Sequence, residues 1–169
     1  MSVKTKRDKQ FVDSIQQKTR AKQMYYNRYL MIRYFLAIFM FANFYWFVCT
    51  TNTMKIIPGV LFILGAISCI EVAKVYGKKQ DEMKWTKRFY QLQMIVNVVC
   101  LILIWTPLFH LLLPFLVDVV ITRIVATGIY LIGGMMAFAC VYRLKQIDQN
   151  SDKKYLYIKQ YEKTANMNI

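Results

Sequence analysis

Four polar residues in otherwise apolar stretches are the best candidates for chemistry in this sequence: Arg33, Glu71, Lys74 and Gln93. At a rise of about 1.5 Å per residue, each lies within two turns of the same predicted membrane face. Glu71 is the single acidic residue of its apolar stretch, and a carboxylate facing lipid is unfavourable, so we expect it to point inward and pair with Arg33 or Lys74. The set predicts an inner-side polar pocket for an ion, a proton or an anionic head group.

The same residues also suit a structural role. Arg33 and Lys74 are long enough to extend their charged groups to the membrane surface, and Glu71 would then belong to a structural ion pair. The pocket hypothesis predicts that Glu71→Gln abolishes activity and leaves the amount of folded protein unchanged. A simple loss of folded protein in that variant would contradict it.

Motifs for catalysis or metal binding do not occur in the sequence. His110 is the only histidine, and there is no H-E-x-x-H, P-loop or G-x-S-x-G pattern. The cysteines form no C-x-x-C pair and lie in apolar stretches, so we interpret them as packing residues: Cys49, Cys69, Cys100 and Cys140. We therefore expect no enzymatic activity, no catalytic residues, no metal and no cofactor.

Apolar helices must position these side chains. Of the 169 residues, 57% are hydrophobic, and four stretches reach the roughly 20 apolar residues that cross a bilayer. These stretches are about 29–50, 56–76, 89–108 and 123–142. They are too long and too continuously apolar for barrel strands. The sequence thus predicts an all-α integral membrane protein with four transmembrane helices (29–142) arranged as two hairpins, with a basic N-terminal segment (1–28) and a basic tail (143–169).

The distribution of basic residues predicts the orientation. Of the 23 Lys and Arg, 19 lie before residue 29, between the second and third helices, or after residue 142. Because cytoplasmic segments carry the Lys/Arg excess, both termini are predicted to be cytoplasmic, in a cell-membrane protein. The net charge of +14 would be attracted to anionic lipids of the inner leaflet, and we expect no nucleic-acid binding.

A surplus apolar segment follows the third helix on the outer side. The residues from His110 to 119 are too few to cross the membrane and too apolar for a solvated loop. Pro107 precedes the segment and Pro114 lies within it, and each proline disrupts helical hydrogen bonding. We expect it to lie along the outer interface or to be re-entrant, with Asp118 near the return to water. The alternative is one long third helix that is kinked at Pro107.

Small residues recur at helical spacing in two of the helices: Gly65, Cys69 and Ala73, and Gly133 and Ala137. Such stripes let helix backbones approach closely in lipid, and they predict either packing inside the bundle or a homodimer face. Asn43 and Asn97 can form hydrogen bonds between helices. Their expected depths differ by about 9 Å, so we do not expect them to pair directly.

The absence of catalytic motifs and the small size of the soluble segments favour a non-enzymatic role. We expect an accessory, interaction or immunity-type component of a larger membrane system, in contact with a larger membrane-protein partner or with a second copy of itself. The alternative is a small dimeric transporter or flippase that uses the polar pocket around Glu71. Proton-dependent transport that is lost in Glu71→Gln would favour this alternative.

Overall fold

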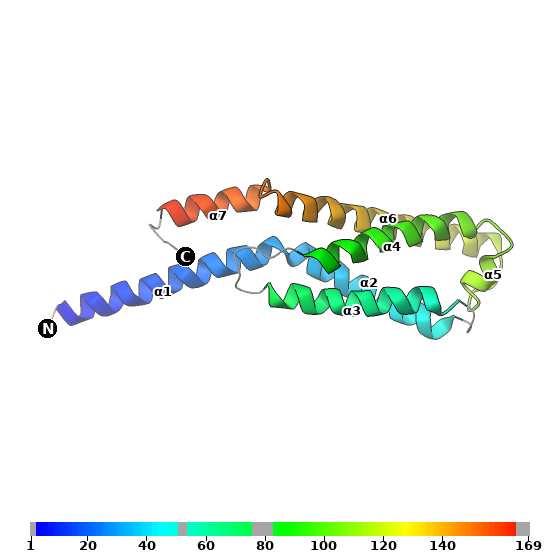
Figure 1. The fold of residues 1–169 in the computed structure, drawn as a ribbon, viewed down its shortest axis with the longest axis horizontal. Coiled ribbons are helices and arrows are strands. Elements are labelled where there is room, and N and C mark those ends of the chain that lie inside the picture. Colours follow the sequence, from blue (N-terminus) through cyan, green and yellow to red (C-terminus); the bar gives the residue numbers. More distant parts are fainter. Residues whose placement is uncertain (1–2, 51–53, 76–82, 165–169) are drawn as a thin grey trace. The chain divides into compact units, whose positions relative to one another are not determined.

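The computed structural model describes residues 3–50, 54–75 and 83–164. Figure 1 shows the elements in chain order: α1 (Val3–Arg28), α2 (Leu30–Cys49), α3 (Ile56–Lys74), α4 (Lys84–Leu103), α5 (Phe109–Leu112), α6 (Val120–Asp148) and α7 (Lys153–Thr164). No strand occurs among the described residues. The all-α prediction is confirmed for this part of the chain.

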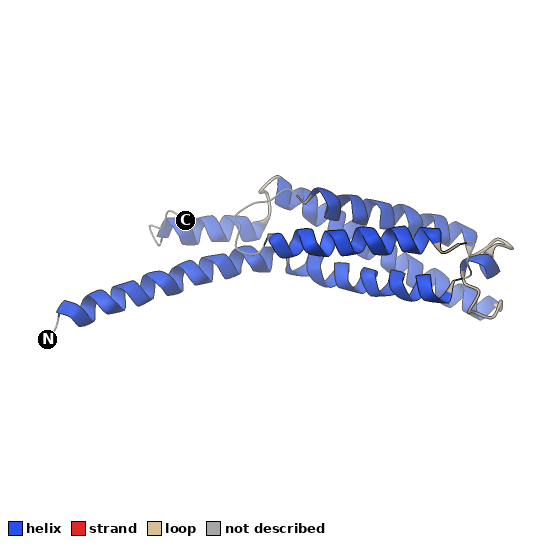
Figure 2. Ribbon diagram, turned by 60° about the horizontal axis from the view of Figure 1, so that its bottom comes forward, coloured by secondary structure: helices blue, strands red, loops and turns tan. Residues whose placement is uncertain are grey.

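The chain divides into two compact units. We call Met31–Lys74 together with Met83–Lys145 the bundle unit, which contains α2 to α5 and most of α6. The terminal unit contains α1, α7 and the end of α6 from Gln146. Within the bundle unit the long helices α2, α3, α4 and α6 run alongside one another (Figure 2).

Three helical stretches among the described residues are long and apolar enough to cross a membrane. They are Leu30–Cys49, Ile56–Lys74 and Val120–Tyr161, the last of which begins with α6. Large apolar side chains on these helices are exposed, including Phe41, Val48, Ile63, Ile70, Ile124 and Phe138. Apolar surface of this extent needs a cover of lipid or protein. The fold is therefore that of a membrane-embedded protein.

The helix boundaries depart from the predicted ones where charge and proline intervene. Hydropathy predicts the third helix at 89–108, but α4 spans Lys84–Leu103. Its early start falls in a charged segment that hydropathy does not mark, and it ends before Pro107, which cannot continue a helical ladder. The end of the helix predicted over 56–76 lies outside the described residues, as do Lys78 and Lys79.

The segment between α4 and α6 packs onto one end of the bundle unit. Phe109 and Leu112 of α5 are buried in a cluster with Trp46 and Ile104. The indole Nε1 of Trp46 donates a hydrogen bond to the Leu112 carbonyl oxygen at 3.0 Å. Because α4 ends at Leu103 and α5 is a separate helix, the alternative of one long kinked third helix is wrong.

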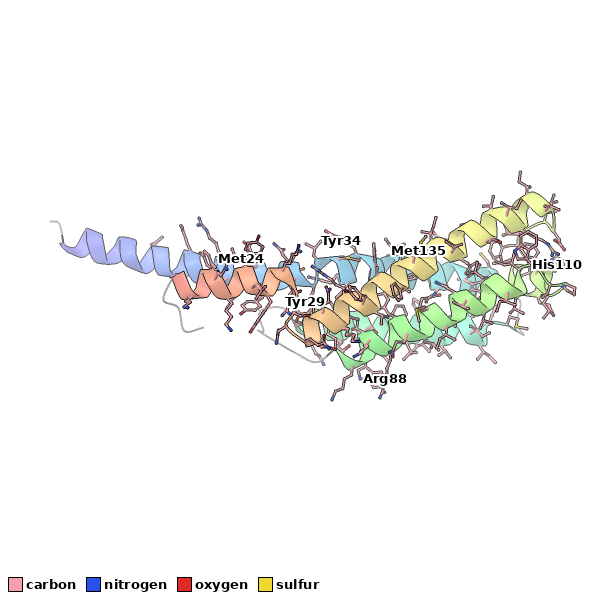
Figure 3. All side chains as sticks on the ribbon, turned by 90° about the horizontal axis from the view of Figure 1, so that it is seen from above. Met24, Tyr29, Tyr34, Arg88, His110 and Met135 are labelled. Atoms are coloured by element: carbon pink, nitrogen blue, oxygen red, sulfur yellow. The ribbon has the colours of Figure 1, made fainter. Side chains whose placement is uncertain are left out.

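The residues predicted to lie at the outer side of the membrane are found in this segment between α4 and α6. His110 belongs to α5, at the end of the bundle unit (Figure 3), and both His110 and Pro107 are exposed. Pro114 is half-buried. Asp118 accepts a hydrogen bond from Arg123 Nε at 2.7 Å, and the Arg123 guanidinium lies 5.2 Å from the centre of the Phe109 ring. Arg123 thereby ties the segment to the start of α6.

The small residues differ in how closely their neighbours approach. A Cβ atom on Gly65 would lie 3.3 Å from the Phe89 ring, and one on Gly133 would lie 3.0 Å from Asn97 Nδ2. Ala137 is fully buried, Cys69 is half-buried and Ala73 is exposed. Gly65, Gly133 and Ala137 therefore lie where neighbouring side chains of the bundle unit pack closely.

Candidate functional site

Glu71 of α3 caps the first turn of α4. Its Oε2 accepts hydrogen bonds from the Thr86 backbone N–H at 2.7 Å and from the Thr86 hydroxyl at 2.8 Å. Its Oε1 accepts a bond from the Trp85 N–H at 3.2 Å. Helix N-termini leave these N–H groups without helical partners, and the residue at the cap position, Met83, has no side-chain acceptor. The Glu71 carboxylate, on the neighbouring helix, supplies the hydrogen-bond acceptor that Met83 lacks.

One of the four residues of the predicted polar pocket lines the cavity described below, and the other three lie outside its lining. Gln93 lines the cavity described below, whereas Arg33, Glu71 and Lys74 are not among its lining residues. Lys74 is exposed and Arg33 is half-buried. The hydrogen bonds of Glu71 and Gln93 described for this structure go to different partners. Glu71 thus belongs to the α3–α4 contact, and Gln93 belongs to a separate polar group.

That separate group is a row of three buried amide side chains, on α2 and α4. Asn43 Nδ2 donates to Gln93 Oε1 at 2.8 Å, and Gln93 Nε2 donates to Asn97 Oδ1 at 3.1 Å. The two asparagines do not bond each other directly, because Gln93 lies between them. Burying an amide is unfavourable unless it is hydrogen-bonded, and the row meets most of that requirement internally. Gln93 and Asn97 are four residues apart on one helix, a spacing that signals such a pair.

The amide row lies on the wall of a cavity of about 450 Å³ in the bundle unit. Its walls come from α2, α4, α6 and the segment 113–116: Phe39, Ala42, Tyr45, Trp46, Cys49, Leu113, Phe115, Leu116, Thr122, Val125, Ala126, Ile129, Tyr130 and Gly133 join the three amides. Tyr45 and Ile129 are 68% and 64% exposed, so the cavity opens at the surface where α2 and α6 flank it. Its size is that of pockets that bind small organic molecules.

One hydrogen-bond donor on this wall has no partner among the described residues. Asn97 is 3% exposed, and its Nδ2 makes no hydrogen bond. The absence of a side chain at Gly133 leaves room for this nitrogen, since an added Cβ would lie only 3.0 Å from it. A buried N–H without an acceptor is unfavourable by about 1–3 kcal/mol. Asn97 lines the cavity, so the cavity wall contains one unsatisfied hydrogen-bond donor.

The terminal unit contains a second polar cluster, which sequence reasoning missed. Arg28 of α1 and Asp152, just before α7, have fully buried side chains and form an ion pair. Arg28 Nη2 also donates to the carbonyl oxygen of Ile147 at 3.0 Å and to Asn150 Oδ1 at 3.1 Å. The guanidinium lies 5.0 Å from the centre of the Tyr155 ring. We call this cluster the α1–α7 clasp.

The turn between α6 and α7 is shaped to present this clasp. Asn150 has a φ of 51°, the left-handed conformation that often ends a helix. The Ser151 N–H donates to the Gln146 carbonyl at 3.1 Å, and the Asn150 N–H donates to the Ile147 carbonyl at 3.0 Å. This pair of bonds is the Schellman arrangement, and asparagine tolerates the required backbone better than most residues do. The local sequence Asn150-Ser151-Asp152 is the signal that marks the turn.

Neither polar cluster has the composition of a metal site. Groups of three or more His, Cys, Asp or Glu side chains placed to hold a metal ion are absent from residues 3–50, 54–75 and 83–164. Amides are weak candidates for acid–base chemistry, because neither their nitrogen nor their oxygen titrates near neutral pH. What the bundle unit offers is a shaped, apolar cavity with hydrogen-bonding amides. No protein-family model, curated protein or solved structure matches this chain.

Proposed function

We propose that this chain is a four-pass cell-membrane protein that acts as a non-enzymatic accessory or interaction component of a larger membrane system. The fourth pass is α4, whose 20 residues extend about 30 Å at helical rise, enough to cross the hydrocarbon core. It runs alongside the three apolar helices of the bundle unit (Figure 1). Its basic residues Lys84, Lys87 and Arg88 lie in its first turns, where they would reach the membrane surface.

The capping role of Glu71 is the observation that carries this proposal. A transporter built around the predicted inner pocket would need Glu71 to exchange a proton or an ion during its cycle. In this structure the carboxylate accepts three hydrogen bonds from the start of α4, so its ionised form stabilises a helix end. Such a residue supports a static scaffold better than a transport cycle.

The exposed basic residues support a cytoplasmic position for α1 and α7. Arg20 and Lys22 on α1 are exposed, as are Lys154 and Lys159 on α7. Near an anionic leaflet each such residue contributes on the order of 1 kcal/mol of attraction. Both helices would then lie at the inner surface, in agreement with the positive-inside distribution of the whole chain.

Purification from native membranes tests the accessory role. The tagged protein is extracted in a mild detergent and the mass of the intact particle is determined. We expect a particle that contains a second membrane protein in fixed stoichiometry. A homodimer with no second protein would contradict the accessory role and would favour the dimeric transporter.

Reporter fusions test the topology independently. Alkaline phosphatase and green fluorescent protein are fused in turn at the N-terminus, at the C-terminus and after residue 118. We expect fluorescence at both termini and phosphatase activity after residue 118. Phosphatase activity at either terminus would contradict the four-pass arrangement with cytoplasmic ends.

A further inference from the structure

The cavity of the bundle unit has the chemistry of a binding site for an uncharged molecule. Its 17 lining residues include no Lys, Arg, Asp, Glu or His. An ion placed there would lose its hydration without gaining a countercharge, which is strongly unfavourable. The polar groups that project from the otherwise apolar walls are side-chain amides and hydroxyls, which suit a neutral ligand.

The unsatisfied nitrogen of Asn97 specifies what the ligand must offer. Asn97 Oδ1 is already engaged by Gln93 Nε2, while Asn97 Nδ2 is buried and without a partner among the described residues. An N–H donor requires an acceptor, and a carbonyl oxygen is the strongest neutral one. A hydrocarbon would fill the space but would leave this donor unpaired.

We propose that the cavity binds a neutral, ring-containing lipophile of the bilayer whose carbonyl oxygen accepts a hydrogen bond from Asn97 Nδ2, the chemical class to which membrane quinones belong. The Gln93 amide orients Asn97, whose nitrogen lies close to the position that a side chain at Gly133 would occupy. The ligand binds without any change in its oxidation state.

The aromatic walls favour a flat ring over a flexible chain. Phe39, Trp46 and Tyr130 all line the cavity, and the Trp46 and Tyr130 rings already contact each other edge-on with centroids 6.4 Å apart. Trp46 is held in place by its hydrogen bond to the Leu112 carbonyl. Rigid aromatic side chains of this kind contribute contact energy beyond their buried area when another ring packs against them.

The depth of Asn97 favours a ring carbonyl over the ester groups of ordinary lipids. Asn97 precedes the end of α4 at Leu103 by six residues, which is about 9 Å along the helix. With α4 crossing the membrane, an arrangement that rests on the proposed function, Asn97 lies well inside the hydrocarbon core. Glycerolipid esters lie at its edge, whereas a quinone ring can enter the core. Exposed lining residues on α2 and α6 provide the way in from the side.

Quenching of Trp46 fluorescence measures the binding directly. Trp85 and Trp105 lie outside the cavity lining and are exposed, so a Trp85→Phe/Trp105→Phe background leaves Trp46 as the reporter. The purified full-length protein in mild detergent is titrated with 2,3-dimethyl-1,4-naphthoquinone. Its carbonyl-free counterpart, 2,3-dimethylnaphthalene, is then tested as a competitor at the same detergent concentration. We expect saturable quenching and about tenfold weaker binding of the hydrocarbon, after correction for partition into detergent.

Two variants assign the effect to the cavity and to the amide. Ala42 lines the cavity and is exposed, so Ala42→Phe fills the cavity, while Ala73→Phe makes the same change at an exposed alanine outside the lining. We expect Ala42→Phe to abolish saturable quenching and Ala73→Phe to preserve it. Asn97→Leu should weaken quinone binding about tenfold and leave hydrocarbon binding unchanged.

Several outcomes would overturn the proposal. Quenching that rises linearly without saturation, or that is equal in Ala42→Phe, would show collision with detergent-dissolved quinone only. Equal affinity of the unmodified cavity for both ligands would remove the role of the Asn97 donor, and this comparison needs no variant at position 97. Because no partner protein enters the assay, a failure here leaves the accessory role to be decided by its own experiment.

Discussion

Arg28 and Asp152 form a fully buried ion pair although 124 residues separate them in the sequence. Arg28 Nε lies 2.9 Å and 3.0 Å from the two carboxylate oxygens. Arg28 Nη2 also donates to a backbone oxygen and an amide oxygen of the α6–α7 turn, whereas the buried Nη1 has no hydrogen-bond partner among the described residues. A buried pair with such additional bonds fixes one specific geometry more than it adds net stability.

Removing one member of this pair should open the α1–α7 clasp. Asp152→Asn leaves the Arg28 charge buried without its counterion, which destabilises by about 3–5 kcal/mol. Hydrogen exchange of the α7 backbone amides measures the effect, and we expect their protection to collapse. The bundle unit should keep its protection.

Matched variants separate this effect from a general change of charge. Arg20→Met removes a charge from an exposed position of the same helix and should leave α7 protected. The double variant Arg28→Met/Asp152→Leu removes both buried charges and should recover much of the lost protection. A clasp that is unaffected by Asp152→Asn would show that the ion pair contributes nothing to the terminal unit.

Glu71→Gln should lower the stability of the fold. The variant loses the negative charge at the start of α4 and keeps one acceptor oxygen, so the expected loss is about 0.5–2 kcal/mol. Thermal unfolding in detergent and the yield of folded protein are the measurements. Lys74→Gln, at an exposed position of the same helix, is the control and should unfold like the unmodified protein.

The same variant discriminates between the two functional hypotheses. If Glu71→Gln retains full thermal stability and abolishes an uptake or release activity, then the residue works in transport. Reduced stability with no effect on transport is the result expected of a helix cap.

Gly133→Leu and Gly134→Leu should differ sharply, although the residues are neighbours in α6. A side chain at Gly133 meets Asn97 Nδ2 at 3.0 Å, whereas a Cβ on Gly134 has nothing within 4 Å. Overpacking at Gly133 should destabilise by about 1–3 kcal/mol, and Gly134→Leu should be tolerated. Thermal unfolding of the two purified variants gives the comparison. Equal stability would mean that α6 does not approach Asn97 closely.

The contribution of the Asp118–Arg123 pair to stability should be lost at low pH. The hydrogen bond from Arg123 lowers the pKa of the Asp118 carboxyl from its ordinary value of 3.8. A lowered folded-state pKa means that the contribution to stability is present at neutral pH and disappears as the pH falls through that lowered pKa. We expect Asp118→Asn to unfold at a lower temperature than the unmodified protein at neutral pH. In strong acid the two proteins should unfold at the same temperature. Because Asp118 is exposed, the difference should be small and should shrink with added salt.

Hydropathy locates α2 and α3 well, because a continuous apolar stretch is a local signal. The first two helices are predicted at 29–50 and 56–76, and the structure has Leu30–Cys49 and Ile56–Lys74. The start of α4 is harder, since its cap comes from Glu71, twelve residues before Met83 and on another helix. When the capping side chain comes from another helix, the residues just before the capped helix show no capping motif.

The polar contacts show the same contrast between local and distant signals. Depth along the helices correctly separates Asn43 from Asn97, but only the packed structure shows that Gln93 connects them. From the sequence, Asp152 is interpreted as part of a solvated basic tail. The residues around it give no indication that it pairs with an arginine 124 residues earlier. Pairings of this kind depend on tertiary packing and not on propensity.

The clasp also has a consequence for the order in which the molecule is made. Translation proceeds at about 5–20 residues per second, so Asp152 follows Arg28 out of the ribosome by roughly 6–25 s. During that interval α1 has no countercharge for Arg28, while α2 to α6 are synthesised and can enter the bilayer. A chain that stalls or is cleaved before residue 152 keeps its whole apolar bundle and an unmatched guanidinium. The clasp thus distinguishes a chain that extends past Asp152 from one that ends before it.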